Sequence, residues 1–133
     1  MKYFFILLLL AFCSCKTEEN KFLLKKGDIL FQDLDSSPLC DAIELVTKGY
    51  DNRNFSHIGI VVETGELDKI KYPNYNYNND VKILEAIPDK VVTTKLDSFL
   101  NRSVDKNNNP KVIVGRLKPE YSNLIDDAII FLK

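Results

Sequence analysis

Hydrophobic residues in this chain fall into short runs separated by polar turns, and the strongest run covers residues 55–62. Most of its residues are β-branched or aromatic, which favours a pleated, largely buried strand over a short helix. Alternation along such a strand puts the only histidine, His57, on the same face as Gly59. The absent glycine side chain would let another segment of the protein approach the imidazole ring.

Further strands are predicted at residues 27–31, 81–87, 91–93 and 112–117. In the run 81–87 the alternating pattern places Glu85 on the same face as Val81 and Ile83. Burying an unpaired carboxylate is costly, so we expect Glu85 to contact a partner.

Two helices have recognisable first residues. Ser37 and Pro38 suit the N-cap and first position of a helix that Gly49 can close. The buried stripe predicted for it consists of Leu39, Ala42, Ile43 and Val46. Thr94 and Asp97 resemble a capping box that opens a second, short helix. A third helix is predicted after Pro119, and the polar segment 66–80 reads as a loop whose tyrosines pack on the surface.

Short strands separated by helices and turns favour an α+β fold with a mainly antiparallel sheet. The chain has 133 residues, 45% of them hydrophobic and 28% charged, which is typical of one globular domain. A net charge of −1 provides no positive surface for nucleic acid. One histidine, few cysteines and scattered carboxylates show no metal-ligand spacing, so we expect no metal and no other cofactor.

The N-terminus looks like an export signal, because Lys2 precedes an apolar run that is too short to span a bilayer comfortably. Its end, Cys13-Ser14-Cys15, resembles a bacterial lipoprotein lipobox. That resemblance implies that residues 1–14 are removed, that Cys15 is acylated and inserted into membrane lipid, and that residues 15–21 form a tether. An ordinary cleaved signal and a short N-terminal anchor are the alternatives.

The processing implied by the lipobox would leave Cys40 as the one free thiol of the mature chain. If Cys13 leaves with the signal and Cys15 carries lipid, Cys40 has no partner for a disulfide. Such a thiol is either buried and inert or reactive, and the first turn of a helix favours the thiolate.

The strands that carry His57 and Glu85 suggest hydrolytic chemistry if they are neighbours. The carboxylate could then bind one imidazole nitrogen and leave the other nitrogen to act as a base. This arrangement supplies two of the three groups of a cysteine-hydrolase triad.

Several segments resemble the permuted papain-like hydrolases of the YiiX type, a circularly permuted branch of the NlpC superfamily. They are Gly-Asp-Ile-Leu-Phe at 27–31, Ala42-Ile43 with Thr47, Phe-Ser-His-Ile-Gly-Ile-Val at 55–61 and Leu-Glu-Ala at 84–86. The resemblance covers about residues 24–117. It implies a papain-like fold with a small antiparallel barrel packed on helices, and amide-bond hydrolysis with His57 as the base and Glu85 as its orienting group.

The nucleophile departs from this family pattern, in which the catalytic cysteine follows the histidine and glutamate. No cysteine follows Glu85 in this sequence. We therefore expect residues 22–133 to be a partial domain whose nucleophile lies C-terminal to this chain, or a diverged copy that has lost the thiol. Cys40 is the one thiol that could substitute, although the family pattern gives its position no chemistry.

The sequence thus predicts a membrane-tethered cysteine amidase or peptidase of the bacterial cell envelope, acting on cell-wall peptides or acylated amines. The alternative is a non-catalytic lipoprotein module that binds a peptide or a lipid. Without a closing helix, the sheet face around His57 and Gly59 is expected to stay uncovered, with Gly59 keeping room for that helix.

Overall fold

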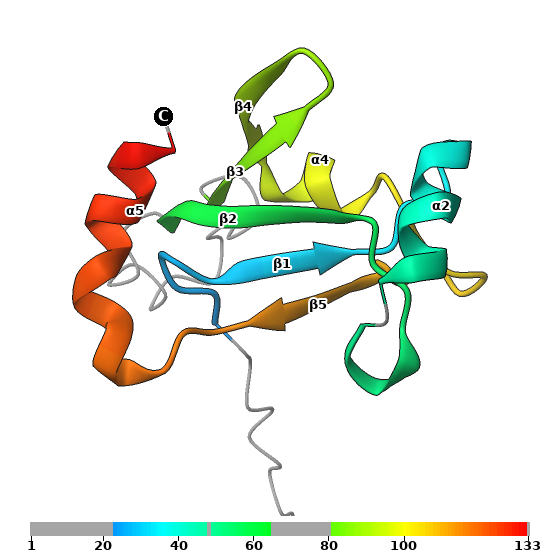
Figure 1. Cartoon of the computed structure of the whole chain (residues 1–133). Helices are drawn as coiled ribbons and strands as arrows, with labels where there is room; N and C mark the ends of the chain where they lie inside the picture. Colours follow the sequence, from blue (N-terminus) through cyan, green and yellow to red (C-terminus); the bar gives the residue numbers. More distant parts are fainter. Residues whose placement is uncertain (1–22, 48, 65–80, 133) are drawn as a thin grey trace, which may run out of the picture.

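A computed structural model describes residues 23–47, 49–64 and 81–132. The predicted signal, the tether and the loop 66–80 lie outside these residues. Five strands form one antiparallel sheet in the order β4-β3-β2-β1-β5 (Figure 1). The strands are β1 (Ile29–Gln32), β2 (His57–Thr64), β3 (Val81–Ile87), β4 (Lys90–Lys95) and β5 (Val112–Gly115). The expected α+β class is confirmed, and in the described residues the sheet is open, with β4 and β5 at its edges, instead of the expected barrel.

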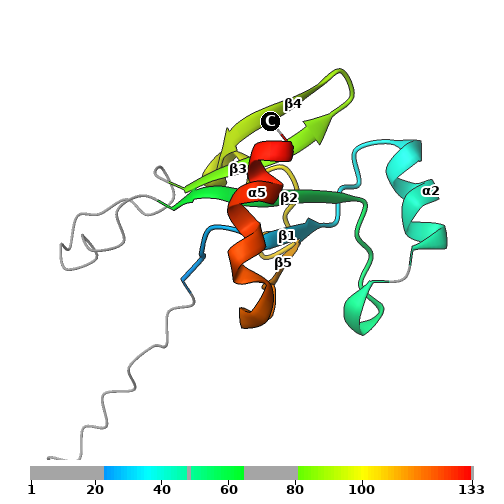
Figure 2. The ribbon, with the colours of Figure 1, turned by 60° about the vertical axis from the view of Figure 1, so that its left-hand side comes forward.

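Three α-helices accompany the sheet in the described part of the chain. They are α2 (Pro38–Val46), α4 (Leu96–Leu100) and α5 (Ile125–Phe131), with short 3-10 helices η2 (Tyr50–Asn52) and η4 (Pro119–Leu124). Helices α4 and α5 pack on opposite faces of the sheet, and α2 stands at the end where β1 finishes (Figures 1 and 2). None of the described helices is long and apolar enough to cross a bilayer.

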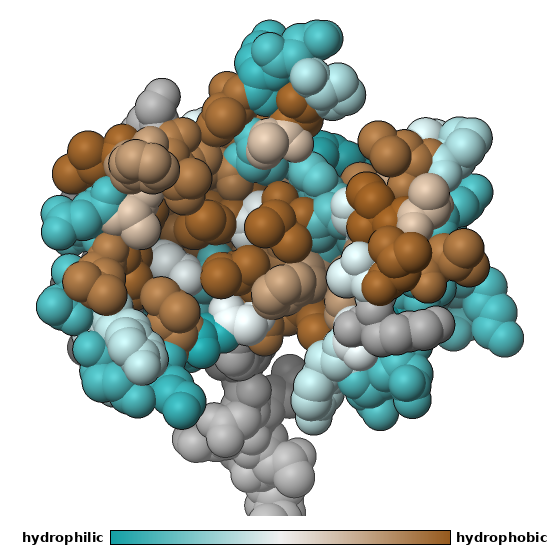
Figure 3. Space-filling view, in the orientation of Figure 1, coloured by the Kyte–Doolittle hydropathy of each residue, from teal (hydrophilic) through white to brown (hydrophobic). Residues whose placement is uncertain are grey.

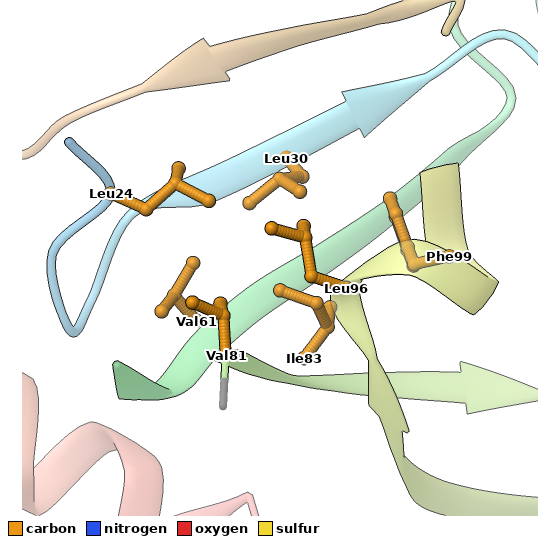
Figure 4. Packing of buried hydrophobic residues seen from close by; sticks show 7 residues of the cluster. All are labelled: Leu24, Leu30, Val61, Val81, Ile83, Leu96 and Phe99. Carbon is orange, nitrogen blue, oxygen red and sulfur yellow. The ribbon is translucent and has the colours of Figure 1, made fainter. Parts of the chain in front are cut away.

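The main core lies between α4 and the inner face of β1, β2 and β3 (Figure 4). Its buried residues are Leu24, Leu30, Val61, Val81, Ile83, Leu96 and Phe99. Alternation supplies one side chain from every second strand position, and Leu96 and Phe99 are one helical turn apart on α4. Burial of each large apolar side chain stabilises the fold by about 1.5–3 kcal/mol, so α4 is held firmly although it is short.

Gly59 faces this core, and its role differs from the one expected. A Cβ atom at Gly59 would collide with the side chains of Ile83 and Phe99. The expectation that this face is uncovered was wrong, because α4 already fills the space beside the glycine. The exposed face is the opposite one, where Ile58 is 53% exposed.

Helix α2 starts as predicted and buries a different face. Ser37 is the N-cap and accepts a hydrogen bond from Cys40 N, but the helix ends at Val46 and is closed by Thr47, not by Gly49. The buried residues are Cys40 and Glu44, whereas most of the predicted apolar stripe is exposed. This stripe was wrong because α2 stands beyond the end of β1 and does not lie over a face of the sheet (Figure 2).

The predicted capping box was also wrong. Thr94 belongs to β4, and α4 begins after Lys95 without a side-chain cap. The Thr94 hydroxyl instead points to a carboxylate on β3, because Thr94 pairs with Ile83 in the sheet. The last predicted helix is present as η4 followed by α5.

Candidate active site

His57 and Glu85 meet across neighbouring strands. β2 pairs with β3 in a register that sets Gly59 opposite Glu85. His57 is two residues before Gly59 on β2, so its side chain lies on the same face of the sheet as Glu85. His57 Nε2 lies 2.7 Å from Glu85 Oε2. The strand pairing and the contact expected from the sequence are therefore both present.

Glu85 is also bound by two residues that the sequence did not single out. Arg102 donates from Nη1 to Oε2 at 2.6 Å and from Nη2 to Oε1 at 2.5 Å, as a fork of two parallel bonds. The Thr94 hydroxyl donates to Oε1. The Glu85 side chain has no solvent exposure, so its full set of donors compensates for the loss of water.

These contacts decide the charge of Glu85. Burial alone would raise the pKa of this carboxyl, but hydrogen bonds from His57, Arg102 and Thr94 outweigh burial and lower the pKa to about 2. Arg102 has a raised pKa, mainly because of its hydrogen bonds to Glu85. Glu85 is consequently a carboxylate at neutral pH and can only accept hydrogen bonds.

This charge fixes the tautomer of neutral His57. Because the carboxylate accepts, Nε2 must carry the proton, and Nδ1 is left as the nitrogen that can take up another proton. The ring lies 5.8 Å from the Phe99 ring, and the His57 side chain is 17% exposed. The imidazole is thus oriented from one side by Glu85 and packed by α4.

Gln32 holds α4 in this position. It pairs with His57 in the sheet and is fully buried, and its Nε2 donates to Phe99 O at 2.7 Å. The ring of Phe99 in turn lies 5.5 Å below the Arg102 guanidinium. The end of β1 therefore supports the helix that packs both the histidine and the arginine.

Cys40 belongs to a separate group of polar residues. Its Sγ lies 3.4 Å from both Ser36 Oγ and Ser37 Oγ, and these hydrogen bonds lower the pKa of the thiol to about 7. In the residues that the structure describes, no hydrogen bond joins Cys40 to His57. The arrangement activates the thiol but does not couple it to the proposed base.

A largely apolar groove of about 490 Å³ runs over the exposed face of the sheet. Figure 3 shows it as the brown surface between α5 and α2. The lining residues are Phe31, Ile43, Thr47, Phe55, Ser56, His57, Ile58, Gly59, Ile60, Leu84, Glu85, Ala86, Val91 and Leu132. The groove therefore passes over the strand segments that carry His57 and Glu85.

Arg102 and Thr94 are the site residues that sequence reasoning missed. The feature of the sequence that could have indicated them is Glu85 itself. A carboxylate buried among apolar residues is costly unless it pairs with a cation such as arginine. The sequence contains many basic residues and offered no reason to choose Arg102, which lies just beyond α4.

Comparison with protein-family models, curated proteins and solved structures found no match for this chain.

Proposed function

We propose that this chain carries the base half of a cysteine-hydrolase site, with His57 as the general base and Glu85 as its orienting group. The supporting observation is the buried Glu85 carboxylate 2.7 Å from the imidazole. A carboxylate that orients a histidine and stabilises its charged form is the usual support for an activated nucleophile. The reaction proposed is cleavage of an amide bond in cell-wall peptides or acylated amines.

In this proposal a thiol gives its proton to His57 Nδ1 and the sulfur attacks the amide carbonyl carbon. The protonated imidazole then donates that proton to the leaving amine as the carbon–nitrogen bond breaks, and water later releases the acyl group from sulfur. Glu85 stays ionised throughout and stabilises the imidazolium. Arg102 and Thr94 are positioning residues, because they fix the carboxylate and not the substrate.

The thiol of this proposal lies C-terminal to the present sequence, as the resemblance to the permuted hydrolases implies. Cys40 is the second choice, because its contacts are to serines and not to His57. Acylation at Cys15 would tether the domain to a membrane of the bacterial envelope.

The experiment uses the longest natural form of the protein, assayed for amine release from cell-wall peptides and from N-acyl amines. His57→Gln should lower the rate by about 100-fold or more, which is the usual contribution of a general base. Glu63→Gln is the matched control, because Glu63 forms a half-exposed ion pair with Lys82 on the same strand pair. Cys40→Ser should leave the rate unchanged.

Two results would count against this assignment. Full activity in His57→Gln would remove the proposed base. Loss of activity in Cys40→Ser, with an unchanged melting temperature, would move the nucleophile to α2. Thermal melts of each variant separate loss of chemistry from loss of folding.

The apolar groove also favours a second candidate function, that of a non-catalytic module that binds an acyl chain. Its volume and apolar lining are typical of ligand sites. Displacement of a fluorescent fatty acid by unlabelled lipid would measure this binding. Retained binding in His57→Gln, with no hydrolysis by the natural form, would support the binding function over the hydrolase.

A further inference from the structure

Three carboxylates meet at the end of the sheet beside α2. Asp33 and Asp35 lie in the loop that joins β1 to α2, and Glu44 belongs to α2. One oxygen from each lies within 4.8 Å of the others. Sequence patterns did not reveal this group, because Glu44 reaches the two aspartates only when α2 folds back on the end of β1.

Lys111 only partly compensates the charge of these carboxylates. Its Nζ lies 3.0 Å from Asp33 Oδ1 and 2.5 Å from Asp35 Oδ2. Three carboxylates and one ammonium group leave two negative charges, which is the charge that one divalent cation neutralises. Within the described residues Lys111 forms no ion pair with Glu44, so the charge of Glu44 has no cation of its own there.

The burial of Glu44 indicates that the three carboxylates bind a ligand. The residue is only 9% exposed, although it lies on a helix whose apolar residues Leu45 and Val46 are about 80% exposed. Its Oε1 is buried and has no hydrogen-bond partner among the residues that the structure describes. A buried, unpartnered carboxylate is expensive, and a bound cation is the usual compensation.

We propose that Asp33, Asp35 and Glu44 form a binding site for a hard divalent cation, with Ca²⁺ as the favoured ion. Carboxylate oxygens without nitrogen or sulfur ligands select hard cations. Calcium–oxygen distances are about 2.3–2.6 Å, so oxygens on opposite sides of one Ca²⁺ lie about 4.6–5.2 Å apart, in keeping with the spacing here. Mg²⁺ uses fewer carboxylates and keeps more water.

The site is accessible to solvent. The Asp35 side chain is 68% exposed, and Asp33 and Lys111 line an adjoining cavity of about 330 Å³. Waters can therefore complete the coordination shell, and the ion has an entry path. A bound ion would tie α2 to the end of β1 (Figure 2), and most apolar side chains of this helix are exposed.

The test uses the purified chain, with isothermal titration calorimetry and thermal melts in CaCl₂, MgCl₂ or NaCl at equal ionic strength. Ca²⁺ should bind with a Kd of about 0.1–1 mM, the range of exposed extracellular sites, and should raise Tm more than Mg²⁺ does. Glu44→Gln should abolish the Ca²⁺ response and raise Tm in EDTA, because it removes an unpaired buried charge. Glu63→Gln, in a remote ion pair, should behave like the natural sequence.

Removal of the competing ammonium gives an independent second test. Lys111→Gln should lower the Kd for Ca²⁺ several-fold, because all three carboxylates then face the ion. The site would be refuted if CaCl₂ had no effect beyond that of NaCl, or if Glu44→Gln kept the full response. An equal response to Mg²⁺ would overturn the assignment to calcium.

Discussion

At the scale of single residues, Glu85 determines the character of the candidate active site. Its position in an apolar row predicted a partner, and that partner includes His57, as the sequence suggested. The sequence did not reveal that Arg102 and Thr94 complete the group. The register between β3 and β4 brings Thr94 to the carboxylate, and the packing of α4 brings Arg102 there.

The lowered pKa of Glu85 predicts a specific acid response. The pKa is about 2 in the folded protein, against an ordinary value of 4.5. A carboxyl with a depressed pKa stabilises the fold fully above the unfolded value, and the stabilisation is lost as pH falls from about 4.5 towards 2. The linked free energy is roughly 3 kcal/mol.

Urea unfolding at a series of pH values measures this effect. Glu85→Gln should flatten the dependence of unfolding free energy on pH in this acid range. Glu63→Gln should keep the dependence, because its ion pair with Lys82 is about half exposed and contributes little. An unchanged slope in Glu85→Gln would mean that other carboxylates account for the acid sensitivity.

At the scale of elements, the strands were predictable and the helix faces were not. β2 and β3 are rich in β-branched residues, so local preference and tertiary context agree. On α2 the apolar stripe predicted one buried face, but the helix instead turns Cys40 and Glu44 toward the loop that follows β1. Periodicity alone cannot register this, because the contact depends on residues far apart in the chain.

The contact between β2 and α4 gives the second prediction. Gly59→Ala should destabilise the protein by about 1–3 kcal/mol, since the new methyl group collides with Ile83 and Phe99. In a double-mutant cycle with Ile83→Ala the cost of the double variant should fall short of the sum of the two single costs, because the second change removes the nearer of the two colliding side chains. Chemical denaturation of the four proteins measures the coupling. Purely additive costs would contradict close packing at this point.

At the scale of the whole molecule, helices cover the two faces of the sheet to different extents. One face is closed by α4, whereas the other is only partly covered by α5 and leaves the apolar groove exposed (Figure 3). We expect this surface to bind hydrophobic dyes and to promote association. Exposed apolar patches of this kind often mark interaction surfaces.

A single charged substitution can test this expectation. Ile58 lines the groove and is 53% exposed, so Ile58→Glu should reduce dye fluorescence and self-association with little loss of stability. Ile130→Glu is the matched control, because Ile130 is 72% exposed and lies outside the groove lining. Equal effects of the two variants on dye binding would show that the groove is not the binding surface.

The proposed site requires that Glu85 orients His57 so that Nδ1 is its basic nitrogen. Because His57 is the only histidine, nitrogen NMR of the ¹⁵N-labelled chain reports this ring without ambiguity. We predict that the neutral imidazole carries its proton on Nε2, and that Glu85→Gln lowers the population of this tautomer. A neutral ring protonated on Nδ1 would contradict the proposed site.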